Sequence, residues 1–213
     1  MSEWLELHPV NPQRRWLQRA VTRLREGAVI AYPTDSCYAL GCLAGDKHAA
    51  ERIRDIRQFG RERLFTLVCR DLAEISVYAR VDNWQYRLLR QLTPGPYTFI
   101  LEATRELPRR LPHEKRKTIG IRVPEHKVVQ ALLELLGEPL VSCTLQFPDA
   151  PEPVNDPRDW REPLARAVDL VLDGGPCGLV PTTVLDLTGS TPALVRRGRG
   201  DVSGLGLDEG GAG

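Results

Sequence analysis

The sequence predicts one mixed α/β domain, built on a twisted and mostly mixed or antiparallel open sheet that is flanked by helices. Two observations indicate this fold class. Short apolar runs and segments with helical spacing of apolar residues follow one another without the strict alternation of a doubly wound fold. The chain has 213 residues, of which 42% are hydrophobic, enough for a sizeable core. We therefore expect a single domain over residues 1–213, with its core at about 13–200 and a disordered Gly-rich tail at 208–213.

Helical spacing of apolar residues, together with capping signals, places the helices. Asp46 and Asp71 precede two of these segments and are typical N-caps, because a carboxylate accepts hydrogen bonds from the first free backbone N–H groups. Gly27 and Gly137 end two others. The predicted helices are 13–26, 46–58, 71–79, 82–92, 126–136 and the later part of 157–167.

Short apolar or alternating runs between those helices place the strands. Pro33 and Pro124 each close one run, since proline cannot donate a backbone hydrogen bond to a neighbouring strand. The Pro-rich stretch 147–158 is expected to be a surface loop. The predicted strands are 28–32, 65–69, 97–103, 119–123, 140–144, 167–172, 183–187 and 194–196.

Composition and missing motifs exclude several classes of protein. The net charge is only +1, and the five cysteines are scattered without a Cys-x-x-Cys pair. No apolar run reaches membrane-spanning length and no secretory signal is visible, so we expect a cytoplasmic protein with free thiols, no membrane contact and no zinc site. The phosphate-binding loop of P-loop proteins is absent, the four histidines lack metal-ligand spacing, and no residue set indicates a covalent catalyst.

A group of small polar side chains follows the first long predicted strand. After Pro33 come Thr34, Asp35, Ser36 and Tyr38, so four of five residues carry a hydroxyl or a carboxylate. Open α/β sheets place ligand sites at such strand ends. The alternative is an ordinary strand-to-loop turn that is rich in hydroxyl groups.

Arginines near strand ends complete the chemical inventory. Arg122 ends one predicted strand, Arg196 precedes a glycine, and Thr182 and Thr183 open another strand. Guanidinium groups bind phosphate or carboxylate bidentately, so this inventory suits a site that orients an anion rather than forming a bond to it. The alternative for Arg122 is a surface salt bridge.

Residues 32–41 resemble the Pro-Thr-acid-Thr-x-Tyr-Gly-Leu-Gly element of the YrdC-like family. Four further segments are similar to family motifs in the family's order, and together the matches cover about residues 13–200. Details at 65–72 and 114–120 look most like the YciO branch of that family. The four further segments are 92–98, 118–124, 181–186 and 195–198.

The resemblance implies a fold and an activity. Members of the family are nucleotidyltransferases that join L-threonine, bicarbonate and ATP into threonylcarbamoyl-adenylate (threonylcarbamoyl-AMP) and release pyrophosphate, with Mg²⁺ accompanying ATP. The product serves the threonylcarbamoyl modification of adenosine 37 in tRNA. The YrdC-like fold is a twisted mixed sheet with a positively lined concave surface.

The resemblance also implies roles for individual residues. Arg122 matches the arginine that holds the amino-acid carboxylate, and Thr182 matches a serine near the phosphates. The substrate-binding residues expected in this way are Thr34, Tyr38, Arg122 and Thr183. The expected nucleotide-binding residues are Arg57, Arg61, Arg63, Thr144, Gln146, Thr182 and Arg196.

Two motifs of the family are altered in this chain. An ungapped count places Gln58 and Gly60 at a Lys-x-Arg pair, with the nearby arginines at 57, 61 and 63 as candidate substitutes. Thr144 and Gln146 stand at a Ser-x-Asn pair, and Cys69 stands where many members have histidine. Removing one preorganised cation costs about 10²–10³ in rate, so we expect synthesis with weak or altered activity.

A second reading is a binding protein without efficient synthase activity. The concave surface of the family has been linked to double-stranded RNA, and shape-based binding of RNA or tRNA needs only lysines and arginines. The near-neutral net charge counts against this reading. The candidate RNA-binding residues are Arg109, Arg110, Lys115, Arg116 and Lys117.

Overall fold

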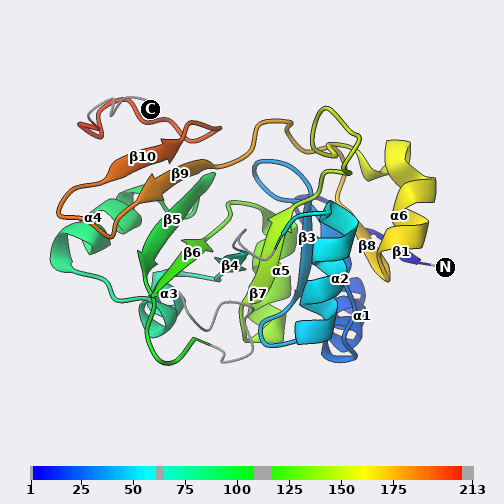
Figure 1. The fold of residues 1–213 in the computed structure, drawn as a ribbon. Coiled ribbons are helices and arrows are strands. Elements are labelled where there is room, and N and C mark those ends of the chain that lie inside the picture. The colour runs from blue at the N-terminus through cyan, green and yellow to red at the C-terminus, as the bar shows by residue number, and fades with distance from the viewer. Residues whose placement is uncertain (1, 61–64, 108–116, 208–213) are drawn as a thin grey trace.

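The computed structural model describes residues 2–60, 65–107 and 117–207. Within these residues, ten strands form one sheet in the order β1-β8-β2-β3-β7-β4-β6-β5-β9-β10 (Figure 1). Four neighbouring pairs are parallel and five are antiparallel. The predicted mixed open sheet flanked by helices is therefore confirmed. The expected tail at 208–213 lies outside the described residues.

The helices lie where capping and periodicity predict them. The Asp46 carboxylate accepts a hydrogen bond from the Ala49 N–H at 3.0 Å, and Asp71 accepts one from Glu74 at 2.8 Å. Gly137 ends α5 with a φ of 75°, in the left-handed region. None of the described helices is long and apolar enough to cross a bilayer. The helices are α1 Arg14–Arg25, α2 Lys47–Arg57, α3 Leu72–Tyr78, α4 Asn83–Leu92, α5 Lys127–Leu136, the 3₁₀ helix η1 Pro157–Trp160 and α6 Arg161–Ala167.

The structure contains two strands, β1 and β3, that the sequence analysis does not predict. Strand β3 contains Gly41, a residue that weakens strands, but a Cβ there would lie 2.7 Å from Cε1 of Tyr32 on the neighbouring strand, so packing requires glycine. The strands are β1 Glu3–Glu6, β2 Ile30–Tyr32, β3 Ala39–Leu43, β4 Thr66–Val68, β5 Tyr97–Glu102, β6 Thr118–Arg122, β7 Leu140–Thr144, β8 Leu170–Asp173, β9 Thr183–Asp186 and β10 Ala193–Arg196.

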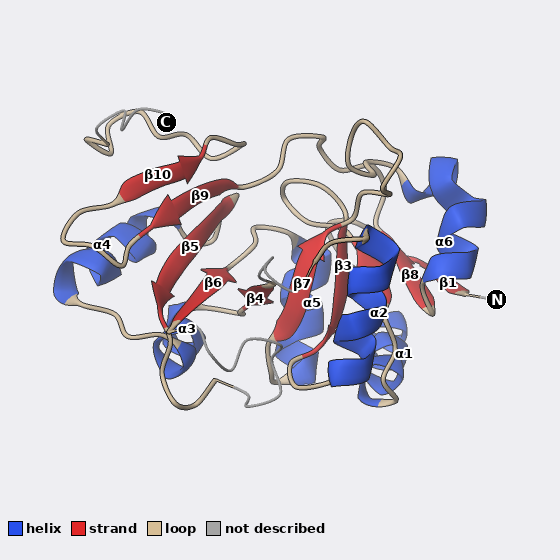
Figure 2. Ribbon diagram, viewed as in Figure 1, coloured by secondary structure: helices blue, strands red, loops and turns tan. Residues whose placement is uncertain are grey.

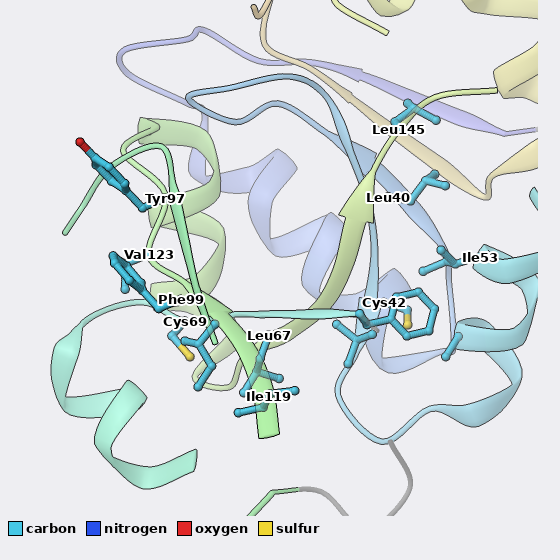
Figure 3. Close-up of a cluster of buried hydrophobic side chains, with 14 of the residues drawn as sticks. Leu40, Cys42, Ile53, Leu67, Cys69, Tyr97, Phe99, Ile119, Val123 and Leu145 are labelled. Atoms are coloured by element: carbon cyan, nitrogen blue, oxygen red, sulfur yellow. The ribbon is translucent and has the colours of Figure 1, made fainter. Parts of the chain in front are cut away.

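Apolar side chains form two clusters on the two faces of the sheet. On β8, Val171 belongs to the first cluster and its neighbours Leu170 and Leu172 belong to the second. The first cluster, part of which is drawn in Figure 3, joins the sheet to α2, α3, α4 and α6. The second joins it to α1 and α5, which lie on the other side of β3 from α2 (Figure 2).

The second cluster does not extend over the half of the sheet that contains β5, β6 and β9. Among the described residues, none from these three strands belongs to it. On β5, Phe99 and Leu101 pack in the first cluster, so Thr98 and Ile100 point to the opposite face. That face carries the candidate site.

Candidate functional site

The uncovered face of the sheet is the floor of a cavity of about 210 Å³. Three guanidinium groups line it, from Arg57, Arg122 and Arg196. No Asp or Glu is among the described residues that line the cavity, so its lining is positively charged. Six serine and threonine side chains add hydroxyl groups, and Tyr38 adds a seventh; the six are Ser36, Thr66, Thr98, Ser142, Thr144 and Thr182. Such a lining suits an anionic ligand with several polar groups.

Arg122, at the end of β6, contributes a buried guanidinium. It is ion-paired with Asp35, and the two side chains are only 10% and 9% exposed. Asp35 is held in turn by the backbone N–H of Glu125 at 2.8 Å, and Arg122 Nη1 lies 3.4 Å from Ser36 Oγ. The Nε of Arg122 is buried without a hydrogen-bond partner in the described structure. The sequence-based alternative of a surface salt bridge is therefore wrong, because both members of the pair are buried.

Arg57 is the last residue of α2 and reaches the same cavity. Its Nη1 donates a hydrogen bond to the backbone carbonyl of Gln146, and the helix ends at Gln58 with a φ of 50°. The cavity is lined by Arg57 and Phe59, which flank Gln58, one of the two positions that the ungapped count assigns to the Lys-x-Arg pair. Arg61 and Arg63 lie outside the described residues.

Arg196 and Thr182 meet at the other side of the cavity. The Nη2 of Arg196 donates to the carbonyl of Thr182 at 2.9 Å, and the hydroxyl of Thr182 lies 2.9 Å from that of Thr98. Thr183 has no exposed surface and is not among the lining residues. Its hydroxyl donates to the Gly200 carbonyl at 2.7 Å and accepts from Gly198 N–H at 3.0 Å, so it anchors the segment after β10.

The hydroxyl groups of Thr34 and Tyr38 form hydrogen bonds with backbone groups. Thr34 Oγ1 donates to the Cys37 carbonyl at 2.7 Å and closes the turn after β2. Tyr38 Oη donates to the Gly175 carbonyl at 2.8 Å and accepts from Gly174 N–H at 3.1 Å. Burial raises the pKa of Tyr38 far above its ordinary value, so it stays protonated. Substrate binding by these two hydroxyls stays a prediction. Tyr38 lines the cavity, whereas Thr34 is not among its described lining residues.

The remaining predicted residues are only partly described. Thr144 lines the cavity at the end of β7, whereas Gln146 is not among the lining residues and its side chain donates to the Ala150 carbonyl at 3.0 Å. Lys117 is exposed, and it is the one candidate RNA-binding residue within the described ranges. The others, Arg109, Arg110, Lys115 and Arg116, lie outside them.

Several lining residues were not found from the sequence. Thr66, Thr98 and Ser142 come from three different strands, and Gly120 lies on β6 in the floor. The alternation Thr98-Phe99-Ile100-Leu101 was the available signal that one face of β5 differs from the other. No group of three or more His, Cys, Asp or Glu side chains that could bind a metal occurs in the described residues.

We expect Tyr38→Phe to lower the free energy of unfolding by about 1–3 kcal/mol, because Gly174 N–H loses a buried acceptor. Urea unfolding measures this change. Tyr86→Phe is the matched control, since Tyr86 is 46% exposed, and it should change stability by less than about 0.5 kcal/mol. Equal stability of Tyr38→Phe and wild type would contradict a structural role for this hydroxyl.

Comparison with known proteins places the chain among close relatives of YciO. The uncharacterized protein YciO of Escherichia coli K12 is 54% identical over 202 residues, which cover 95% of this chain and 98% of that protein. The crystal structure of E. coli YciO matches with a TM-score of 0.90 at 53% identity, over 95% of this chain and 98% of the other. The fold is therefore the YrdC-like fold of that structure.

More distant matches include a named enzyme. Threonylcarbamoyl-AMP synthase of Chromobacterium violaceum is 38% identical over 137 residues, covering 64% of this chain and 70% of that protein. Pyrococcus abyssi Sua5, crystallised with L-threonine, shares the fold with a TM-score of 0.84 at 24% identity, over 92% of this chain and 58% of that one. The family model Sua5_yciO_yrdC, described as telomere recombination, matches residues 22–198. The chain belongs to the Sua5/YciO/YrdC family.

Proposed function

We propose that the cavity binds ATP and L-threonine and that the protein forms threonylcarbamoyl-adenylate from threonine, bicarbonate and ATP for tRNA modification. The observation that carries this proposal is the convergence of three guanidinium groups on one hydroxyl-lined cavity without a carboxylate among its described lining residues. Threonine and ATP both present anionic oxygens, which such a lining stabilises. The distant relationship to a threonylcarbamoyl-AMP synthase supports the choice of ligands.

The chemistry requires positioning and neutralisation of charge. In the proposed reaction, a carbamate oxygen of N-carboxylated threonine forms a bond to the α-phosphorus of ATP, and the bond to pyrophosphate breaks. Arg122 holds the threonine carboxylate, while Arg57, Arg196 and Thr182 face the phosphates. Mg²⁺ bound to the ATP phosphates would neutralise further charge, and no carboxylate is among the described lining residues that could hold it.

An aromatic residue in the altered motif bears on the rate. Gln58 and Gly60, which the ungapped count places at the Lys-x-Arg pair, carry no charge, and Phe59 between them lines the cavity. We therefore propose that synthesis is slower than in a relative that has both cations, by about the 10²–10³ that one charged donor contributes.

Release of pyrophosphate tests this function. The purified protein is incubated with ATP, Mg²⁺, bicarbonate and L-threonine, and both pyrophosphate and the adenylate are measured. The proposal predicts product that requires all three substrates and disappears when threonine is omitted. If a synthase with the full Lys-x-Arg motif forms the adenylate in parallel and this protein forms none at long incubation, the synthase proposal is rejected.

RNA binding remains a separate prediction. Of its five candidate residues only Lys117 is described, so the described structure adds no support. Titration with a 20-base-pair RNA duplex tests it, because binding through phosphates must weaken steeply as salt rises.

A further inference from the structure

Gly120 on β6 lines the cavity floor, and packing within the protein does not require glycine at this position. It pairs with Thr66 on β4 and with Ile100 on β5. A Cβ at this position would meet Thr98 Cγ2 at 3.6 Å, Thr66 Oγ1 at 3.7 Å and the Phe65 carbonyl at 3.8 Å, all ordinary contacts. Its φ is outside the left-handed region. Alanine would therefore fit, and would suit a strand better than glycine does.

Two other glycines near the sheet, unlike Gly120, are required by packing. A Cβ at Gly41 would lie 2.7 Å from Tyr32 Cε1, and one at Gly200 would lie 2.3 Å from Tyr97 Cε1, so packing requires glycine at both. At Gly120 the space left by the missing side chain belongs to the cavity instead. Glycine within a strand often marks a place where a ligand approaches the backbone closely.

Arg122 indicates which part of a ligand occupies that space. It lies two residues beyond Gly120 on the same strand and lines the same cavity, so the two Cα atoms are about 6.6 Å apart. The buried Nε of Arg122 has no hydrogen-bond partner in the described structure. If Arg122 holds an amino-acid carboxylate, as in the proposed function, the rest of that amino acid would be within reach of Gly120, the hydroxyl of Thr66 and the methyl group of Thr98.

We propose that Gly120 determines the amino-acid specificity of the cavity by leaving room for a short side chain. This inference rests on the proposed function, because it assumes that an amino acid is bound by Arg122. The floor accepts the hydroxyl and methyl groups of L-threonine. The methyl group of an alanine at position 120 would occupy the volume that the threonine side chain needs. Free glycine, which has no side chain, would still fit.

The test compares Gly120→Ala with wild type and with Gly189→Ala. The control residue, Gly189, is exposed, and a Cβ there would meet only the Thr191 carbonyl at 3.6 Å. Calorimetric titrations use glycine, L-serine, L-threonine and Mg-ATP. We expect the threonine affinity of Gly120→Ala to fall about tenfold or more, the glycine and ATP affinities to change less than about threefold, and serine to lie between. Gly189→Ala should match wild type in every titration.

Three binding results would overturn the inference. An unchanged ratio of threonine to glycine affinity in Gly120→Ala rejects it while leaving the proposed function intact. Loss of ATP affinity with threonine affinity retained assigns the floor to the nucleotide. A wild-type protein that binds no amino acid rejects this inference and the proposed function together. The melting temperature of Gly120→Ala should equal or exceed that of wild type, and a clear decrease would contradict the room seen at this position.

Discussion

Replacing Arg122 with methionine is expected to abolish L-threonine binding and to lower the free energy of unfolding by about 3–5 kcal/mol. The Arg122–Asp35 pair is buried, with both side chains at most 10% exposed. Removing the guanidinium leaves the Asp35 carboxylate in a site of low polarity, with the Glu125 N–H as its remaining donor. Chemical denaturation and calorimetric titration with threonine measure the two effects.

A double variant separates stability from binding. Asp35→Asn in the Arg122→Met background removes the unpaired charge and keeps an acceptor for the Glu125 N–H. Replacing both members of a buried pair is often nearly neutral, so this variant should recover most of the lost stability without recovering threonine binding. Threonine affinity close to wild type in either variant would show that Arg122 does not hold the ligand.

Replacing Arg57 with alanine is expected to slow pyrophosphate release by about 10²–10³, the contribution of one preorganised donor to a developing anion. Arg57 is the described cation nearest to the altered motif, since it ends α2 and lines the cavity. Arg57→Lys keeps the charge at the same place and should retain more of the rate than Arg57→Ala does.

Two measurements keep the Arg57 experiment interpretable. Arg87→Ala is the matched control, because Arg87 is exposed on α4 and is not among the cavity-lining residues; its rate should equal that of wild type. Melting curves show whether loss of the hydrogen bond to the Gln146 carbonyl unfolds the protein. An unchanged rate in a folded Arg57→Ala protein would remove Arg57 from the phosphate site.

Local signals explain which elements could be predicted. The helices were located because caps such as Asp46 and Asp71 and a 3.6-residue period act within a few neighbouring residues. Strand β3 was missed because its glycine is explained only by the ring of Tyr32 on β2. Strand β1 has four residues and is stabilised by parallel pairing with β8, far along the chain.

The candidate site was predictable to a similar extent. Of the residues expected to hold one anionic ligand together, Arg122, Arg196 and Thr182 line the cavity, whereas Thr183 does not. The sequence does not predict Thr66 and Thr98 as site residues. They come together because β4 and β5 both pair with β6, and this pairing is not visible in the local sequence.

Calorimetric titration of Mg-ATP into the purified wild-type protein, with and without L-threonine, tests the central claim most directly. We expect both ligands to bind and Arg122→Met to remove the heat of threonine binding, because three guanidinium groups face one cavity. Absence of binding for both ATP and threonine would contradict the proposed function, since the cavity would then bind neither proposed substrate.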